Sequence, residues 1–515
     1  MTRSGRYARP VSIRASEAQP AVEHTSRAVE AASRGGSRLT AHAWTWAALA
    51  AITTLDATIL SWASLSQHYA FNTNAYDLSW FDQLAWNAAH GHPFRTSFVP
   101  YSFLGNHFEP VVLLLGGLYR LWSSPATLLL LQALAVSLAA IPLFLGARRL
   151  LRSATAGLFI AAAYLLAPQI HRAELFDFHP EMLAPLCICT GFALLSYGRS
   201  AGAVAAVALV FLLKEDAWLI AIGFAGLCWL LPVRRAAGVL LAAGALYFAV
   251  VFGVLMPHFR GADAGLTWRY DYLGAHLRDY PLTAVRHPAL IWSHLTQPAQ
   301  LRHVAGLLAS QALLPLASPA LVAALPLALA HLLSAYPQQR VLDFQYAVAP
   351  TVLFLIAAVF SIRSLAASQL LAPHWQRLGL AGTGRAVVLS GTLLLTELLA
   401  FLLSSPLGLQ YDAALYQQTS HTHLVAQALR RIPAGVAVSA QTGLLPHLSE
   451  RVQIHEFPDL GSADFVAVDR YGRRSSQSIA SGYDAQLAAL PVLGYCPIFD
   501  RDGVQVYERC ALQRR

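Results

Sequence analysis

Long apolar runs, rarely interrupted by charge, recur along most of the chain. Hydrophobic residues account for 56% of its 515 residues, and charged residues account for only 12%. Soluble domains carry roughly 25% charged residues, so the deficit is large. Apolar runs of this kind are typical of helices that cross a lipid bilayer. The sequence therefore predicts an α-helical polytopic membrane protein.

The apolar runs predict about eleven transmembrane helices if the N-terminus lies inside. The predicted spans are residues 42–66, 125–147, 154–168, 182–198, 202–213, 217–231, 236–256, 302–316, 319–335, 346–362 and 386–405. This count places nine loop arginines on the cytoplasmic side, as the positive-inside rule requires. They are Arg148, Arg149, Arg152, Arg199, Arg234, Arg235, Arg363, Arg377 and Arg385.

Two further regions flank the predicted transmembrane domain, which comprises residues 42–405. Residues 1–41 hold seven arginines and show no apolar periodicity, so we expect a disordered cytoplasmic tail. Residues 406–515 contain short β-like runs separated by turn signals, which predict a small α/β domain outside the membrane. Cys496 and Cys510 flank a possible hairpin in that domain and could form a disulfide.

The formal net charge of +9 does not indicate nucleic-acid binding. The arginines are spread among loops and both termini, and no basic segment is interleaved with aromatic residues. Positive loops are instead what a membrane protein requires. We therefore expect membrane lipid, and not nucleic acid, as a partner.

The segment VFLLKEDAWLI places three adjacent charged residues inside an apolar run, and Lys214 is the only lysine of the chain. Two short spans that meet at this triad fit the loop arginines better than one long helix does. We expect Lys214, Glu215 and Asp216 in a cavity just below the outer surface, because charges there must pair or face water. They could form a self-neutralising structural cluster. Alternatively, Lys214 meets an anion such as a phosphate, and the two carboxylates hold it or bind metal.

Two acidic residues lie in the aromatic-rich loop after the first span. Asp77 or Asp82 could act as a general base on an acceptor hydroxyl, with the ring of Trp80 as a nearby substrate contact. Alternatively, Asp77 caps a helix that begins at Leu78. On a helix, residues five apart point about 140° apart, so the two carboxylates need not serve one site.

Histidines and carboxylates alternate in two more outer loops, in the motifs NHFEP and FDFHPE. The residues concerned are His107, Glu109, Asp177, His179 and Glu181. If the loops converge, these side chains could hold a divalent metal such as Mg or Mn. Alternatively, they hydrogen-bond one another and fix the loops, since neither motif matches a strict metal-binding pattern.

A polar rim follows the ninth predicted span and offers a second contact for an anion. It contains His331, Tyr336, Gln338, Gln339, Arg340 and Tyr346. Arg340 could bind phosphate, with Gln339 and Tyr346 as further substrate contacts. The alternative is a rim of interfacial aromatics and snorkelling cations.

Five separated motifs, in the same order, resemble a family of predicted prokaryotic membrane proteins known as domain of unknown function 2079. They are YDLSWFDQLAWN, GNHFEPVVLLL, ELFDFHPEMLAPL, LLKEDAWL and LSAYPQQRVLDFQYAVAP. The resemblance runs from about residue 42 to residue 363. The architecture of this family is similar to that of the GT-C class of membrane glycosyltransferases, which often carry a soluble outer domain.

The resemblance implies a sugar donor attached to a polyprenyl-phosphate carrier and an acidic base in the first outer loop. Asp77 matches that acid best, with Asp82 as the alternative, because the acids here are spaced D-x4-D and are not adjacent. Lys214 or Arg340 would take the carrier phosphate. The class includes members with and without a divalent metal, so the resemblance leaves the metal open.

These features together predict a GT-C-like hexosyl- or pentosyltransferase in the bacterial cytoplasmic membrane, with its N-terminus inside and its site on the outer face. The acceptor would be a cell-envelope glycan, lipid or protein. The alternatives are a transporter or flippase for a lipid-linked or anionic solute, and a structural or sensory protein anchored in the membrane. An outward cavity joining Asp77, His179 and Lys214 would favour the enzyme, whereas a midplane site would favour transport.

Overall fold

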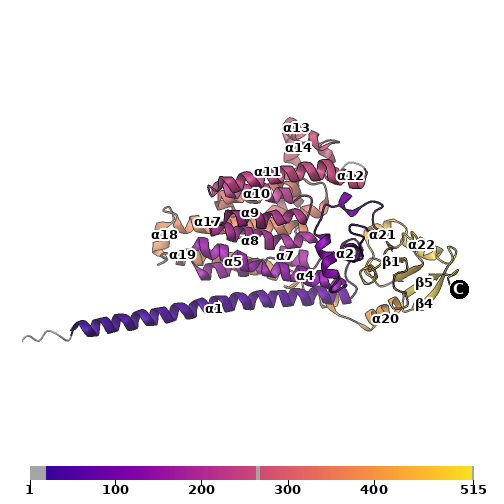
Figure 1. Cartoon of the computed structure of the whole chain (residues 1–515), viewed down its shortest axis with the longest axis horizontal. Coiled ribbons are helices and arrows are strands. Elements are labelled where there is room, and N and C mark those ends of the chain that lie inside the picture. Colours follow the sequence, from indigo (N-terminus) through magenta and orange to yellow (C-terminus); the bar gives the residue numbers. More distant parts are fainter. Residues whose placement is uncertain (1–18, 262–266, 513–515) are drawn as a thin grey trace, which may run out of the picture. The chain divides into compact units, whose positions relative to one another are not determined.

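The computed structural model describes residues 19–261 and 267–512, as a helical part followed by a small domain with a β-sheet (Figure 1). The chain divides into two units, residues 1–50 and residues 51–515. The first helix, α1, spans Gln19–Tyr69. Of the predicted disordered tail, residues 1–18 lie outside the described residues, whereas the backbone of residues 19–41 belongs to α1.

Five helices among the described residues are long and apolar enough to cross a membrane. They are Ala43–Tyr69, Pro125–Leu151, Arg234–Arg260, Gln345–Ala367 and Gly384–Ser404. A sixth span would be the pair Ala154–Leu165 and Pro168–Glu174, which is bent by 43°. Three shorter apolar helices, Pro180–Ser196, Ser200–Leu212 and Ala217–Leu230, coincide with further predicted spans. The multi-pass character is thus supported, and the number eleven stays a prediction.

The predicted spans 302–316 and 319–335 are broken in the structure. Helix α15 (Pro298–Ser310) is followed by the short 3-10 turns η8 (Leu314–Ala317) and η9 (Pro319–Ala323), and then by α16 (Leu325–Leu333). Prolines at 315, 319 and 326 explain the breaks, because proline lacks a backbone N–H and disfavours the helical conformation in the residue before it.

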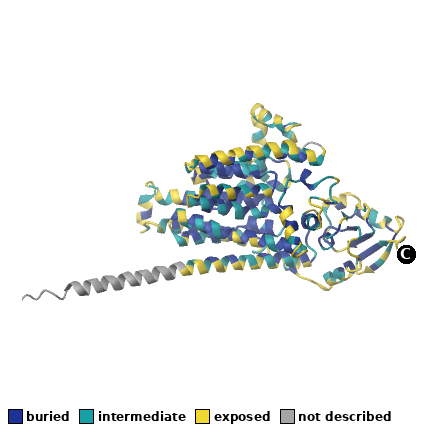
Figure 2. Cartoon of the chain, in the orientation of Figure 1, coloured by how far each residue is buried: buried dark blue, intermediate teal, exposed yellow. Residues whose placement is uncertain are grey.

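Helix α17 (Val348–Ala367) is largely buried among other helices, whereas α11 (Arg234–Val250) and α19 (Gly384–Ser404) expose much of their surface (Figure 2). The exposed side chains on α11 and α19 are mostly apolar, which suits a lipid-facing surface. They include Val239, Leu241, Leu246, Val250, Val388, Leu395, Leu398, Leu399, Leu402 and Leu403.

Three of the arginines that the sequence assigns to one side of the membrane lie together. Arg149, Arg152 and Arg363 line a cavity of about 660 Å³. Gly382, Thr383 and Ala386, around the start of α19, line the same cavity. The shared cavity agrees with the prediction that these arginines lie on the same face of the membrane, although Arg149 and Arg363 belong to helices.

The C-terminal domain is built on a five-stranded sheet with the order β2-β1-β3-β5-β4. Its strands are β1 (Val438–Ala440), β2 (Ile454–Glu456), β3 (Phe465–Asp469), β4 (Tyr495–Arg501) and β5 (Val504–Arg509). Strand β1 pairs in parallel with β2 and β3, and β5 pairs antiparallel with β3 and β4. Its helices are α20 (Ser420–Leu429), α21 (Ser476–Ala480) and α22 (Tyr483–Ala489). The small sheet domain expected from the sequence is therefore present.

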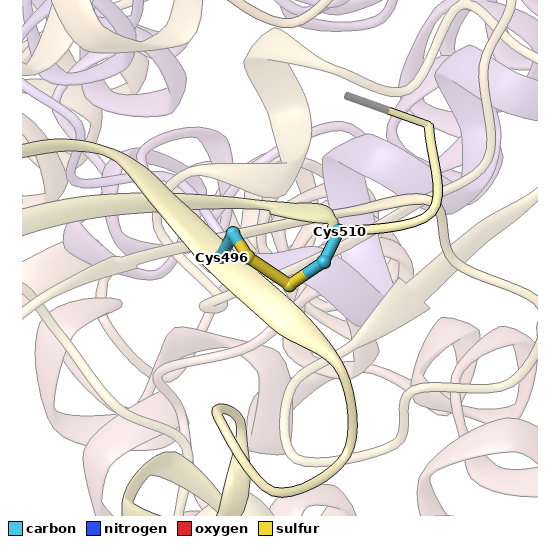
Figure 3. The surroundings of a disulfide bond; sticks show 2 residues. All are labelled: Cys496 and Cys510. Carbon is cyan, nitrogen blue, oxygen red and sulfur yellow. A yellow bond between two sulfur atoms is a disulfide. The ribbon is translucent and has the colours of Figure 1, made fainter. Parts of the chain in front are cut away.

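A disulfide joins Cys496 of β4 to Cys510, directly after β5 (Figure 3). The turn between the two strands contains Asp502 and Gly503, both with positive φ, as a tight hairpin turn requires. The pairing that the sequence left open is thus formed. Structural disulfides are typical of proteins in oxidising compartments, which agrees with a domain outside the cytoplasm.

The C-terminal domain is hydrogen-bonded to the segment that follows α1. The side-chain amide of Gln83 donates to the carbonyl of Arg451 at 3.0 Å. The Ser97 hydroxyl oxygen accepts from the Ile454 backbone N–H at 2.9 Å, and Thr442 Oγ1 accepts from the Ala75 N–H at 3.1 Å. The sheet domain therefore helps to position the loop that carries Asp77.

Candidate functional site

A cavity of about 340 Å³ contains most of the polar residues singled out in the sequence. Its lining includes Asp77, His179, Glu181 and Lys214, which come from three motifs far apart in the chain. Gln477 of α21 also lines it, so the C-terminal domain contributes to the same wall. The cavity brings together Asp77, His179 and Lys214 as one group.

Asp77 lies inside a π-helical turn, η1 (Ala75–Ser79), that leads into α2 (Trp80–Ala89). The residue that caps this turn is Asn74, so the alternative role of Asp77 as a helix cap does not apply. A π-turn inserts an extra residue into a helix and is frequent at functional sites. The Asp77 carboxylate instead meets Nε2 of His179 at 3.1 Å.

His179 is held from both its backbone and its ring. Its N–H donates to Gln132 Oε1 at 2.8 Å, and its Nδ1 lies 3.3 Å from the carbonyl oxygen of Asp177. The ring stacks on Phe176 with a centroid separation of 5.8 Å. These contacts fix the direction of Nε2, so His179 orients the Asp77 carboxylate.

Asp177 has a different role from the metal ligand that its motif suggests. Its Oδ2 accepts hydrogen bonds from the N–H and the side-chain amide of Asn74, at 2.8 and 2.7 Å. Burial, with Asp77 nearby, raises the pKa of the Asp177 carboxyl well above its ordinary value. Its φ of 100° is rare for a residue with a side chain. Asp177 thus anchors the turn that carries Asp77.

Lys214 lies between η4 (Leu209–Leu212) and α10 (Ala217–Leu230), where two short helices meet, as the sequence predicts. It is only 5% exposed and forms an ion pair with Glu181. Its ammonium lies 4.8 Å from the ring centroid of Tyr346, within range of a cation–π interaction. Lys214 is therefore a buried, partnered cation that faces the cavity.

Arg269 is a second cation in the cavity wall and is not among the site residues predicted from the motifs. It is only 7% exposed, and its guanidinium carbon lies 5.0 Å from the ring centroid of Tyr336 and 5.8 Å from that of Tyr346. Its Nε is buried with no hydrogen-bond partner among the described residues. The aromatic neighbours in TWRYDY were the available signal, since an arginine held among aromatics is seldom a plain loop cation.

Four predicted substrate contacts lie outside the cavity lining: Glu215, Asp216, Gln339 and Arg340. Arg340 instead donates to Gln297 Oε1 and to the carbonyl of Ala335, each at 3.3 Å. Gln339 is buried, and Asp216 lies 3.8 Å from His331 Nε2. In the 3-10 turn η10 (Pro337–Arg340), successive side chains point about 120° apart. For this reason Gln338, and not its two successors, faces the cavity.

The predicted metal ligands fall into separate groups. His107 and Glu109 line the cavity and lie with Glu215 in a group whose potential ligand atoms are all within 4.8 Å of one another. His107 Nδ1 is 3.1 Å from Glu215 Oε1. Burial raises the pKa of Glu109 well above its ordinary value, and Glu181 adds to this. One imidazole and two carboxylates form a donor set that suits a divalent metal ion.

Asp82, the alternative candidate base, is fully buried away from the cavity. It accepts hydrogen bonds from the hydroxyls of Tyr119 and Ser449, both at 2.6 Å. Burial, with Glu450 nearby, raises its pKa to about 8. The Asp82 carboxylate joins α2 to the C-terminal domain. It points away from the cavity because, as expected, the side chains of Asp77 and Asp82 leave their shared helical segment in different directions.

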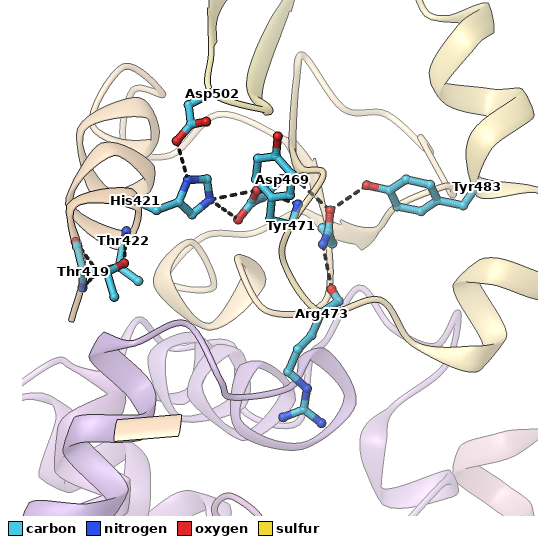
Figure 4. Close-up of polar contacts among 9 residues, drawn as sticks. Thr419, His421, Thr422, Asp469, Tyr471, Arg473, Tyr483 and Asp502 are labelled. Atoms are coloured by element: carbon cyan, nitrogen blue, oxygen red, sulfur yellow. Dashed lines mark hydrogen bonds and ion pairs between the residues drawn. The ribbon is translucent and has the colours of Figure 1, made fainter. Parts of the chain in front are cut away.

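A further polar cluster lies within the C-terminal domain (Figure 4). His421 of α20 bridges Asp469, at the end of β3, and Asp502, in the β4–β5 turn, with contacts of 3.0 and 3.1 Å. Burial alone would lower the pKa of His421, but the hydrogen bonds to the two aspartates raise it. The cluster is separate from the cavity and ties α20 to the sheet.

Comparisons with known proteins extend this description. A search of curated proteins finds no match. The apo structure of ArnT from Cupriavidus metallidurans has a TM-score of 0.50 and 13% identity, over 92% of this chain and 99% of that chain. The structure of ArnT from the same organism bound to undecaprenyl phosphate has a TM-score of 0.48 and 13% identity, over 89% and 98%.

At this identity, the likeness to the apo structure concerns the fold alone. It agrees with the expected resemblance to GT-C membrane glycosyltransferases. A family model described as predicted membrane protein, DUF2079, matches residues 67–504, which include the cavity residues named above and the sheet domain. The chain therefore belongs to the DUF2079 family of predicted membrane proteins, and its fold is similar to that of apo ArnT.

Proposed function

We propose that this protein transfers a sugar from a polyprenyl-phosphate carrier to an acceptor hydroxyl at the outer face of the bacterial cytoplasmic membrane. One observation carries the proposal. A single cavity holds a carboxylate oriented by a histidine, Asp77 with His179, and two buried cations, Lys214 and Arg269. A base and a site for a phosphate are the two parts that this transfer needs.

Asp77 would act as the general base. The acceptor oxygen attacks the anomeric carbon of the donor as Asp77 takes the hydroxyl proton, and the bond between that carbon and the phosphate oxygen breaks. In-line attack of this kind inverts the anomeric centre. His179 is a positioning residue, because its contact at 3.1 Å holds the carboxylate in one direction.

Lys214 and Arg269 would stabilise the leaving phosphate. The departing oxygen keeps the electron pair of the broken bond, so negative charge grows on the lipid phosphate during the reaction. Preorganised cations in a buried site stabilise such charge strongly. Arg269 has an unpartnered Nε, so one of its donors is free for a ligand. Glu181 and Tyr346 hold Lys214 in place.

Aromatic side chains would bind the sugar ring. Tyr76, Trp80, Phe103 and Tyr346 line the cavity, and the buried Trp80 Nε1 has no hydrogen-bond partner among the described residues. An aromatic ring with a free donor suits a ligand with an apolar face and hydroxyl groups. Trp80 and Tyr346 therefore keep their proposed role as substrate contacts.

The fold and the two cavity cations support a lipid phosphate as the carrier of the donor sugar. ArnT, whose apo structure shares the fold, has also been solved bound to undecaprenyl phosphate, and we extend a lipid phosphate of this kind to the present chain. Two cations suit one phosphate group. The disulfide of the C-terminal domain supports an outer location for that domain, with the N-terminus inside.

A divalent metal, Mg or Mn, would be held by His107, Glu109 and Glu215. The three residues fit a cation because their potential ligand atoms already converge within 4.8 Å and Glu109 Oε2 is buried without a partner among the described residues. Such a metal would supply positive charge beside the lipid phosphate. Chelation followed by readdition of Mn²⁺ should then lower and restore the affinity for the lipid phosphate, and an unchanged affinity would remove the metal from the proposal.

The test is single-turnover transfer from labelled polyprenyl-phosphate sugars to an envelope extract by purified full-length protein. Asp77→Asn should slow transfer at least 100-fold, in line with the usual contribution of a general base, and Lys214→Ala should do the same through the phosphate. Arg340→Ala is the matched control and should retain activity. Transfer that survives in both cavity variants, with all proteins folded, would refute the assignment. Donor binding without any transfer would point to a flippase for the lipid-linked sugar.

A further inference from the structure

A second cavity, of about 220 Å³, adjoins the first one. It is lined by Tyr76, Glu456, Pro458, Asp459, Gln477, Ser478 and Ser481. Tyr76 and Gln477 line both cavities. The two side chains thus form a boundary between the chamber that holds Asp77 and a chamber in the C-terminal domain.

The second cavity lies at the end of a parallel strand. Glu456 is the last residue of β2, which pairs in parallel with β1, and Gln477 and Ser478 belong to the short helix α21. In α/β sheets, ligands bind outside the carboxyl ends of the parallel strands. The position therefore agrees with a binding site.

The carboxyl group of Glu456 has side-chain hydrogen bonds with Ser475 and Thr442, but one of its two oxygens lacks a partner. The residue is only 6% exposed, and its Oε1 is buried with no hydrogen-bond partner among the described residues. A buried polar atom without a partner is costly and rare. A donor from a ligand would satisfy it.

The remaining lining residues define which donor fits. Asp459 adds a second carboxylate, the amide of Gln477 offers a donor and an acceptor, and no basic side chain is among the described lining residues. Burial, with Glu456 and Asp459, raises the pKa of Tyr76 to about 12, so its hydroxyl stays neutral. Paired carboxylates accept hydrogen bonds from hydroxyl groups and repel anions.

We propose that the cavity around Glu456 is the acceptor subsite and that it binds a hydroxyl-rich, non-anionic carbohydrate. This proposal rests on the proposed function, because it names the acceptor class for the base at Asp77. Tyr76 precedes Asp77 in η1 and lines both cavities, so a sugar held in the second cavity lies next to the chamber that Asp77 lines. The hydrogen bond from the Ala75 N–H to Thr442 Oγ1, at 3.1 Å, fixes the start of that turn to the sheet domain.

The experiment measures the binding of small glycosides to the full-length protein in lipid nanodiscs by saturation-transfer NMR. The probes are the methyl glycosides of glucose, galactose, mannose and N-acetylglucosamine, with methyl glucuronide as the anionic counterpart. Wild type should bind at least one neutral glycoside and reject the glucuronide. Glu456→Gln and Gln477→Ala should each weaken binding about tenfold, the size expected for a lost charge-assisted or buried hydrogen bond.

Glu508→Gln is the matched control, because Glu508 lies in β5 of the same domain outside the cavity lining. It should bind as wild type does. Gln477 is exposed, so Gln477→Ala tests the subsite even if Glu456→Gln does not fold. Failure of every neutral glycoside to bind, equal binding of the glucuronide, or unchanged binding in both variants would overturn the subsite.

The same assay separates this inference from the proposed function. Asp77→Asn should abolish sugar transfer and still bind the neutral glycoside, because Glu456 and Gln477 of the second cavity are intact. Glycoside binding without any sugar transfer would leave the subsite standing and reject the transferase. Sugar transfer without glycoside binding would reject the acceptor subsite and leave the proposed transferase function standing.

Discussion

Asp77 and Asp82 lie five residues apart and have opposite environments. Asp77 lines a cavity and contacts His179 at 3.1 Å, whereas Asp82 is fully buried against Tyr119 and Ser449. A carboxylate that must take a proton from a substrate has to reach it. The first position can do so, and the second serves the attachment of the C-terminal domain.

Asp82 should make the stability of the protein fall at alkaline pH. Its pKa is raised to about 8 in the folded state, above the ordinary value of about 3.9. A raised folded pKa means that the contribution is complete at low pH and is lost as the pH rises through about 8, where a buried charge appears. Thermal unfolding should therefore occur at a lower temperature at pH 9 than at pH 7.

The Asp82→Asn protein carries no ionisable group at this position, so its unfolding temperature should depend less on pH over the same range. Equal pH dependence in the two proteins would show that Asp82 is already ionised at pH 7. The comparison between the two proteins cancels the contribution of every other titrating group.

At the scale of the element, the π-turn η1 is the structure that presents Asp77. The turn is preceded by its N-cap residue, Asn74. The N–H and the side-chain amide of Asn74 both donate to the buried carboxyl group of Asp177. Asp177 belongs to the same motif as His179, so one short loop both anchors the turn and orients its carboxylate. The geometry of the base thus depends on two loops separated by about a hundred residues.

Asn74→Ala should slow sugar transfer without weakening the binding of the lipid phosphate. The change leaves Asp177 with one hydrogen bond fewer, at a cost of about 1–3 kcal/mol, and loosens η1, while Lys214 and Arg269 lie on other elements. Single-turnover rates and donor affinities measured on the same preparations separate the two effects. A loss of affinity with an unchanged rate would contradict this role.

The disulfide should stabilise the hairpin formed by β4 and β5. Cys496 and Cys510 are 14 residues apart, and a closed loop of this size contributes about 3 kcal/mol. The double variant Cys496→Ser, Cys510→Ser should therefore lower the denaturant midpoint of the C-terminal domain. The control Cys187→Ser, a free cysteine in α8 (Ala184–Ser196), should not; equal midpoints in the double variant and wild type would reject this role.

Local patterns predicted several elements well. The hairpin and the meeting of two short helices at Lys214 both follow from turn residues and from the lengths of apolar runs. The 3-10 turns near residue 319 were not predicted. Hydropathy alone predicts a transmembrane helix for any long apolar run and takes no account of the prolines that break it.

For the whole molecule, the sequence indicated the convergence of distant motifs but not the partners within it. For Arg269 the aromatic neighbours in TWRYDY were only a local signal, because its ring contacts with Tyr336 and Tyr346 come from a loop elsewhere in the chain. The group of His107, Glu109 and Glu215 likewise joins two motifs that local spacing treats separately. Such contacts depend on tertiary packing, which cannot be predicted from the spacing of residues within one motif.

The most direct measurement is the affinity of the full-length protein for undecaprenyl phosphate, by native mass spectrometry of the wild type and three variants. Lys214→Met and Arg269→Met each remove one cavity cation and should weaken binding at least tenfold, as loss of a charge-assisted hydrogen bond does. Arg340→Met removes a cation outside the cavity lining and should bind as wild type. Equal affinity in all four proteins, or a loss confined to Arg340→Met, would contradict the account that this cavity holds the carrier phosphate.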